Sequence, residues 1–158
     1  MTDWMKGRVV GLQRSAGGVP KLPVAEAVVG SHGMEGDKQR KPFIHGGPTR
    51  ALCLYSRERI DALAAEGHPI VPGAVGENVT IAGLAWEVVT PGTHLTLGAV
   101  EVEVTSYTAP CRTIARAFIG GEFARIAQKQ HPGWSRVYVR IVRAGRIALD
   151  DVVLVIAP

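Results

Sequence analysis

The segment 106–116, SYTAPCRTIAR, places a cysteine between two different kinds of backbone. An apolar, β-like run precedes it at 100–105, and a short helix-like run follows at 112–118. Pro110 fixes its own φ and biases the preceding residue towards extended backbone, so Cys111 is predicted at a stiff elbow. Free N–H groups in the first helical turn, with Arg112 and Arg116 nearby, would favour a thiolate. The residues alone leave a reactive and a buried structural cysteine both open.

Three glycine-rich turns at predicted strand ends each add a polar or charged residue. They are Gly36-Asp37-Lys38, His45-Gly46-Gly47-Pro48-Thr49-Arg50 and the stretch GAVGEN at 73–78. Glycine lets a backbone approach a ligand closely, and Lys38 and Arg50 supply charges suited to phosphate. Ordinary turn chemistry would explain each turn separately. Their occurrence together with the Cys111 elbow favours one shared anion pocket.

The five histidines and two cysteines show no spacing typical of a protein-only metal site. Because C-x-x-C and H-x-x-x-H are both missing, side chains alone are not expected to hold a metal. A P-loop and a G-x-G-x-x-G motif are also missing, so nucleotide-binding folds are not indicated. A cysteine–histidine dyad at Cys111 stays open, although no spacing points to a particular base. Cys53, inside an apolar strand-like run, is interpreted as structural.

Length and composition predict one folded domain spanning 1–158. The chain has 158 residues, 46% of them hydrophobic and 20% charged, which suits a single core. The start lacks the apolar region of a signal peptide and no run is long enough to span a membrane, so we expect a cytoplasmic protein without a membrane partner. The net charge of +4 is scattered apart from KQRK at 38–41. Without interleaved aromatic residues, this pattern does not predict a nucleic-acid partner.

Short strands dominate the predicted secondary structure, because 19 glycines and 10 prolines indicate many tight turns. Apolar or alternating runs predict strands at 8–12, 23–29, 51–55, 79–81, 93–97, 100–105, 137–142 and 151–156. Gly98-Ala99 between two of them predicts a tight hairpin. We therefore expect a mainly β, barrel-like domain.

Two or three short helices are expected to cover that barrel. Ser56 is a good N-cap for a helix that continues to Ala65 and stops at Gly67. Its buried face is predicted to consist of three residues, Ile60, Leu63 and Ala64. Further helices are predicted at 112–118 and 123–129.

The order of these motifs resembles the MOSC family, named for the C-terminal domain of molybdenum cofactor sulfurase. The resemblance covers the chain from about Val9 to Val155, and PKLP at 20–23 is similar to the small stand-alone bacterial members. The matching segments are Gly36-Asp37, His45-Gly46-Gly47 with Arg50-Ala51, Pro72-Gly73, Gly76-Glu77-Asn78, Pro110-Cys111 and GWSRVY at 133–138.

The resemblance implies a β-barrel of the pyruvate-kinase-barrel type whose pocket handles molybdenum cofactor or sulfur. In the family the motif cysteine is proposed to ligate molybdenum or to carry sulfur as a persulfide, and this role corresponds to Cys111. A thiolate is a suitable ligand for a soft, thiophilic metal. The positions implied to bind the cofactor are Lys38, Arg50, Asn78, Arg136, His45 and Thr108.

Two functions follow from the resemblance, and the residues do not choose between them. The first is a molybdenum-cofactor-dependent oxidoreductase similar to the reductases of N-hydroxylated compounds. It would need an external electron-transfer partner, because the chain has no flavin or iron–sulfur motif. The second is a sulfur carrier served by a cysteine desulfurase, a partner that would bring the pyridoxal phosphate for which this chain has no recognisable site. A β-domain with an incidental cysteine is a third interpretation.

Overall fold

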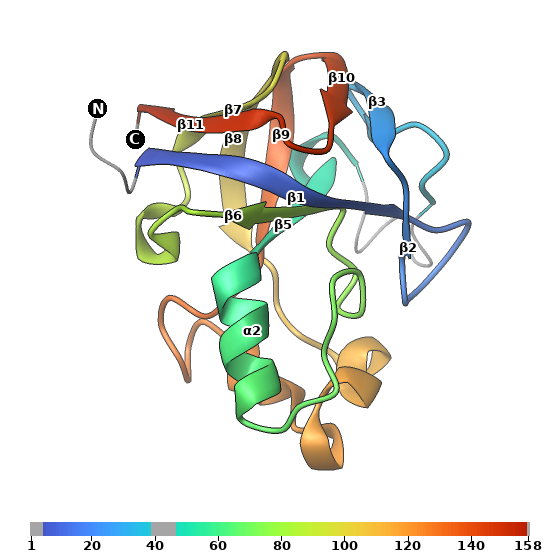
Figure 1. Cartoon of the computed structure of the whole chain (residues 1–158), viewed down its shortest axis with the longest axis vertical. Helices are drawn as coiled ribbons and strands as arrows, with labels where there is room; N and C mark the ends of the chain where they lie inside the picture. The colour runs from blue at the N-terminus through green and yellow to red at the C-terminus, as the bar shows by residue number, and fades with distance from the viewer. Residues whose placement is uncertain (1–4, 39–46, 158) are drawn as a thin grey trace.

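Seven strands close on themselves into a barrel in the computed structural model, which describes residues 5–38 and 47–157 (Figure 1). The barrel order is β11-β7-β8-β9-β5-β6-β1, and pairing of β1 with β11 completes the ring. The strands are β1 (Lys6–Arg14), β2 (Leu22–Pro23), β3 (Glu26–Gly30), β4 (Gly33–Met34), β5 (Leu52–Ser56), β6 (Val79–Ala82), β7 (His94–Leu97), β8 (Val100–Tyr107), β9 (Val137–Arg143), β10 (Gly145–Ala148) and β11 (Val152–Ala157). Closure removes exposed strand edges, and it confirms the predicted β-barrel.

The run predicted as one strand at 23–29 is divided between two sheets. β2 extends the barrel sheet by pairing with the end of β1, whereas β3 pairs with β10 and β4 in a separate three-stranded sheet. The chain leaves the barrel sheet after Pro23 and enters the second sheet at Glu26, so residues 23–29 do not form one continuous strand. β4 and β10 were not predicted, because neither short segment shows a clear alternation.

The β7–β8 hairpin forms as the alternating pattern predicts. Leu97 pairs with Val100 across the turn, and Gly98 adopts a φ of +59°, which glycine accepts without strain. Val102 and Val104 point into the core and are almost completely buried. This hairpin is a local structure whose turn and alternation lie in one continuous stretch.

The helix α2 (Arg57–Ala65) lies below the barrel in Figure 1. The Ser56 hydroxyl accepts a hydrogen bond from the Arg59 N–H at 3.1 Å, as expected of an N-cap. Gly67 has a φ of +102° just beyond the helix. The buried face is narrower than predicted: Ile60 and Leu63 are buried, but Ala64 is exposed.

The other predicted helices are 3-10 helices rather than α-helices. The helix predicted at 112–118 is η4 (Arg112–Ala117), and the helix predicted at 123–129 is the shorter η6 (Phe123–Ile126). Three further 3-10 helices were not predicted: η2 (Pro48–Arg50), η3 (Trp86–Val88) and η5 (Ile119–Gly121). Gly120 and Gly121 have φ values of +62° and +72°, so a continuous α-helix cannot run through them. Across the two described ranges, no helix is both long and apolar enough to cross a membrane.

One end of the barrel gathers the segments that carry the predicted motifs. The end of β1 faces the start of β6, where Leu12 pairs with Val79, and the end of β8 faces the start of β9. β5 lies between β6 and β9. The loop 15–21, the turn 72–78 and the segment 108–114 all leave the barrel here. Their side chains therefore meet at one site.

Candidate functional site

An open pocket lies at this end of the barrel. It is bounded by the loop that follows β1, the turn before β6, the segment between β8 and η4, and the start of β9. Its lining residues are Gly18, Val19, Lys21, Cys53, Val75, Gly76, Asn78, Thr108, Ala109, Cys111, Thr113, Ile114, Arg136 and Tyr138.

Cys111 stands at the pocket wall as the residue that precedes η4. Its backbone is extended, with φ −145° and ψ 177°, so the chain turns from strand to helix at the predicted elbow. The thiol is partly exposed and forms a hydrogen bond with the Thr113 hydroxyl. It caps no backbone group of η4. Cys111 is thus an accessible thiol whose only side-chain partner among the described residues is one hydroxyl.

Arg136 lines the pocket, and its side chain extends from the residue before β9 to the turn before β6. Its side chain is only 5% exposed, and its Nη1 donates to the Val75 carbonyl at 2.6 Å. Its own carbonyl accepts from the Thr108 N–H at 2.9 Å, which fixes the backbone. Nε has no partner in the described part of the chain. A buried donor therefore remains available beside the pocket.

Glu77 has no exposed surface and lies near enough to Arg136 to be affected by its charge. One carboxyl oxygen accepts from the Thr80 hydroxyl at 3.2 Å, whereas Oε1 has no partner among the described residues. Burial raises the pKa of Glu77 to about 7, although backbone hydrogen bonds and the positive charge of Arg136 lower it. Glu77 can therefore change its protonation state near neutral pH.

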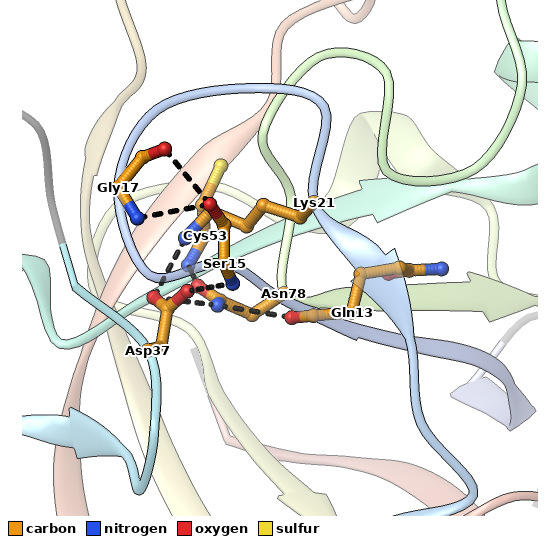
Figure 2. A network of polar contacts seen from close by, with 7 residues as sticks. All are labelled: Gln13, Ser15, Gly17, Lys21, Asp37, Cys53 and Asn78. Atoms are coloured by element: carbon orange, nitrogen blue, oxygen red, sulfur yellow. Dashed lines mark hydrogen bonds and ion pairs between the residues drawn. The ribbon is translucent and has the colours of Figure 1, made fainter.

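A second buried cluster, Lys21–Asp37–Asn78, fixes the loop after β1 to the barrel (Figure 2). The Lys21 Nζ lies 2.6 Å from Asp37 Oδ2, and both side chains are nearly inaccessible to solvent. Asn78 Nδ2 donates to the same oxygen at 3.0 Å, and the Ser15 N–H donates to the other at 2.9 Å. Both Asp37 oxygens are engaged, so the carboxylate is an anchor for three segments.

Asn78 also connects this cluster to the strands. Its Oδ1 accepts from the Cys53 N–H at 3.0 Å, and its Nδ2 also donates to the Gln13 carbonyl at 3.3 Å. The Cys53 thiol lies 3.8 Å from the Thr108 hydroxyl, and burial raises the pKa of this thiol. Cys53 thus has the surroundings of a structural cysteine.

Gly73 lets the loop after β1 pack against the turn before β6. The Lys21 N–H donates to the Gly73 carbonyl at 3.0 Å. Gly73 has a φ of +89°, and a Cβ built on it would lie 2.2 Å from the Lys21 carbonyl oxygen. Only glycine permits this approach, which is one physical reason for the glycine-rich stretch at 73–78.

The structure brings four of the predicted site residues together: Cys111, Thr108, Asn78 and Arg136 all line the pocket. Arg50 does not line the pocket, and its guanidinium lies 5.2 Å from the centre of the ring of Tyr138, which does. Lys38 is exposed, its backbone N–H donates to the Ser15 carbonyl, and it does not line the pocket. The predicted residue His45 lies outside the described residues.

Sequence reasoning missed Lys21 and Tyr138 as pocket residues. Burial raises the pKa of Tyr138 to about 12, so its phenol stays protonated. A signal for Lys21 did exist, because a single lysine between two prolines interrupts an otherwise apolar stretch. Its burial, however, depends on Asp37, which the sequence does not pair with it.

Two curated bacterial proteins are similar to this chain. Protein YflK of Bacillus subtilis is 32% identical over 133 residues, which cover 83% of this chain and 59% of YflK. Protein YiiM of Escherichia coli is 30% identical over 138 residues, which cover 84% of this chain and 60% of YiiM. This chain therefore spans about three fifths of the length of these curated relatives.

Solved structures share the fold. The crystal structure of YiiM from Escherichia coli superposes with a TM-score of 0.73 at 24% identity, covering 98% of this chain and 71% of YiiM. A crystal structure of a hypothetical protein superposes with a TM-score of 0.77 at 26% identity, covering 98% of this chain and 70% of that one.

The MOSC domain model matches residues 41–154. That range contains β5 to β10, the turn before β6, the Cys111 elbow and Arg136. The matched range also contains Arg50-Ala51, Pro72-Gly73 and GWSRVY from the motif set described above. The chain therefore belongs to the MOSC domain family, which is associated with molybdenum cofactor binding and sulfur-related roles.

Proposed function

We propose that the pocket at Cys111 binds a molybdenum cofactor and that the protein reduces N-hydroxylated compounds with electrons from a separate donor. One observation carries this proposal: an accessible thiol shares its pocket with a buried guanidinium that has an unused donor. The thiol suits a soft metal, and the guanidinium suits an anionic group.

The residues present fit such a cofactor. Within the described ranges, no group of three His, Cys, Asp or Glu side chains could hold a metal ion. A metal at Cys111 would therefore need ligands other than side chains, and these are what a cofactor brings. Arg136 would face its anionic part through Nε, whereas the charge of Lys21 is already balanced by Asp37 at 2.6 Å. Cys111 would be the protein ligand to the metal.

When bound, the cofactor would supply two-electron redox chemistry. Cleavage of an N–O bond by reduction consumes two electrons and two protons and releases water. The hydrogen bond between the Thr113 hydroxyl and the Cys111 thiol would orient the sulfur as a ligand. Val19, Ile114 and Tyr138 form apolar parts of the wall and limit water around the reacting group. Two cysteines are too few for a four-cysteine iron–sulfur cluster, so electrons come from a partner.

The test is expression in cells that synthesise the cofactor, followed by measurement of molybdenum per protein. Cys111→Ala should lose most of the metal. Cys53→Ala is the matched control, because it removes the other thiol of the same pocket, and it should retain the metal. Absence of molybdenum from the unmutated protein, or equal metal content in both variants, would contradict the proposal.

A sulfur carrier is the second candidate, and the accessibility of Cys111 favours it. The Cys111 thiolate would attack the terminal sulfur of a desulfurase persulfide, form a new S–S bond and release the desulfurase thiolate. Pyridoxal phosphate would belong to that partner. Mass spectrometry after incubation with a cysteine desulfurase and cysteine should then show one added sulfur at Cys111. An unmodified Cys111 would exclude this function.

A further inference from the structure

Two arginines differ from all the other arginines in the described ranges. Arg57, Arg59, Arg125, Arg140, Arg143 and Arg146 pair with carboxylates, Arg8, Arg14 and Arg136 donate to carbonyls, and Arg50 stacks on Tyr138. Arg112 and Arg116 make no hydrogen bond, ion pair or ring contact with the described residues, and both are exposed. Both lie on η4, the helix that begins beside Cys111.

The periodicity of a 3-10 helix places these two arginines on different faces. Residues three apart share a face, and each step turns the chain by about 120°. Ile114 and Ala117 are buried and form the inward face. Thr113 lines the pocket, so Arg116 shares the pocket side. Arg112 lies on the remaining, outer face.

The segment that carries these charges has no acidic residue of its own. The stretch 111–121, CRTIARAFIGG, contains no aspartate or glutamate. Ile119, on the neighbouring η5, is 54% exposed. We call the exposed residues Arg112, Arg116 and Ile119 the η4 shoulder. It combines two positive charges that have no partner among the described residues with one apolar side chain, on the segment whose Cys111, Thr113 and Ile114 line the pocket.

We infer that the η4 shoulder docks an acidic protein, namely the electron donor that the proposed function requires. Two arginines on separate faces do not converge on one small anion, but they can meet two carboxylates of an extended acidic surface. Opposite charge at the rim would steer the donor to the pocket that holds Cys111. The aromatic residue of the segment, Phe118, is buried, so the shoulder offers no stacking surface for a nucleic acid.

The inference rests on the proposed function, but it is tested without the cofactor. The probe is an acidic flavodoxin, added to isotope-labelled, cofactor-free protein at low ionic strength. Amide NMR shifts map the contact, and the dissociation constant is measured for Arg112→Glu, Arg116→Glu and Lys6→Glu. Lys6 is exposed and also has no recorded partner, but it lies at the far end of β1 from the pocket. Its reversal changes the net charge by the same amount.

The shifts should centre on 111–121, and each η4 reversal should weaken binding about fivefold, with little change for Lys6→Glu. Binding should also weaken as salt is raised to about 0.15 M. Equal weakening by Lys6→Glu, or shifts centred elsewhere, would overturn the inference. Tighter binding of a single-stranded oligonucleotide at the same residues would overturn it in favour of nucleic acid. If the protein binds molybdenum but fails this docking test, the docking inference is contradicted and the proposed function is not.

Discussion

Two buried charged clusters flank the same pocket, and they differ in how completely their polar atoms are paired. In the Lys21–Asp37–Asn78 cluster, both carboxylate oxygens of Asp37 accept hydrogen bonds. In the second cluster, Glu77 and Arg136 each keep one buried polar atom without a partner in the described residues. The first cluster joins three segments of the backbone, and the second leaves hydrogen-bonding capacity unused.

The difference indicates a division of roles. A fully paired buried ion pair is costly to break, so it fixes the position of the loop that carries Lys21. A buried donor without a partner is destabilising in the free protein, and a bound anion would relieve that cost. We therefore interpret the first cluster as the support of the pocket and Arg136 of the second as part of its binding surface.

Removing Asp37 should have the largest effect on stability. Asp37→Ala leaves the Lys21 ammonium buried without its carboxylate, and we expect the free energy of unfolding to fall by about 3–5 kcal/mol. Urea denaturation measures the change. Asp61→Ala, which breaks an exposed pair with Arg57, should cost about 0.5 kcal/mol or less. Similar losses in both variants would show that the Lys21–Asp37 pair is not a support.

Glu77 should make stability depend on pH. An unfolded glutamate loses its proton near its ordinary value of 4.5, and the folded one near 7. Between these values the folded state binds more protons, so the free energy of unfolding falls as pH rises, by up to about 3 kcal/mol. Glu77→Gln should flatten this slope between pH 4.5 and 7 in urea denaturation series. An unchanged slope would show that Glu77 is already ionised in the folded protein.

Arg136 should have the smallest effect on stability but a clear effect on binding. Arg136→Gln removes one hydrogen bond, to Val75, and should cost about 1 kcal/mol. Cofactor affinity should fall about tenfold, because a charged donor is lost. Arg50→Gln is the control, since Arg50 lies outside the pocket, and its cofactor content should remain unchanged. Loss of cofactor in Arg50→Gln but not in Arg136→Gln would indicate that Arg50, rather than Arg136, binds the anionic group.

The parts of the fold that were predictable depend on neighbouring residues. The hairpin at Gly98 and the N-cap at Ser56 each need one short stretch of sequence. Helices were predicted at 112–118 and 123–129, but neither their 3-10 form nor η5 between them was predicted, where Gly120 and Gly121 have positive φ. Local patterns also could not predict the register between β1 and β11, because these are the first and last barrel strands along the chain.

The same distinction applies to the pocket. Cys111 and Asn78 lie in short motifs, so the sequence could point to them. Lys21 is buried only because Asp37 lies 16 residues further on and is itself held by Asn78, 41 residues beyond Asp37. Lys38 and Arg50 have a suitable charge and lie in glycine-rich turns, but their side chains do not line the pocket. Charge and spacing do not fix the direction of a side chain.

X-ray absorption at the molybdenum edge of the loaded protein tests the central claim most directly. The spectrum, normalised per molybdenum, should show one sulfur ligand fewer in Cys111→Ser than in the unmutated protein, with an oxygen in its place. Cys53→Ala should give the spectrum of the unmutated protein. The same number of sulfur ligands in Cys111→Ser would contradict ligation by Cys111.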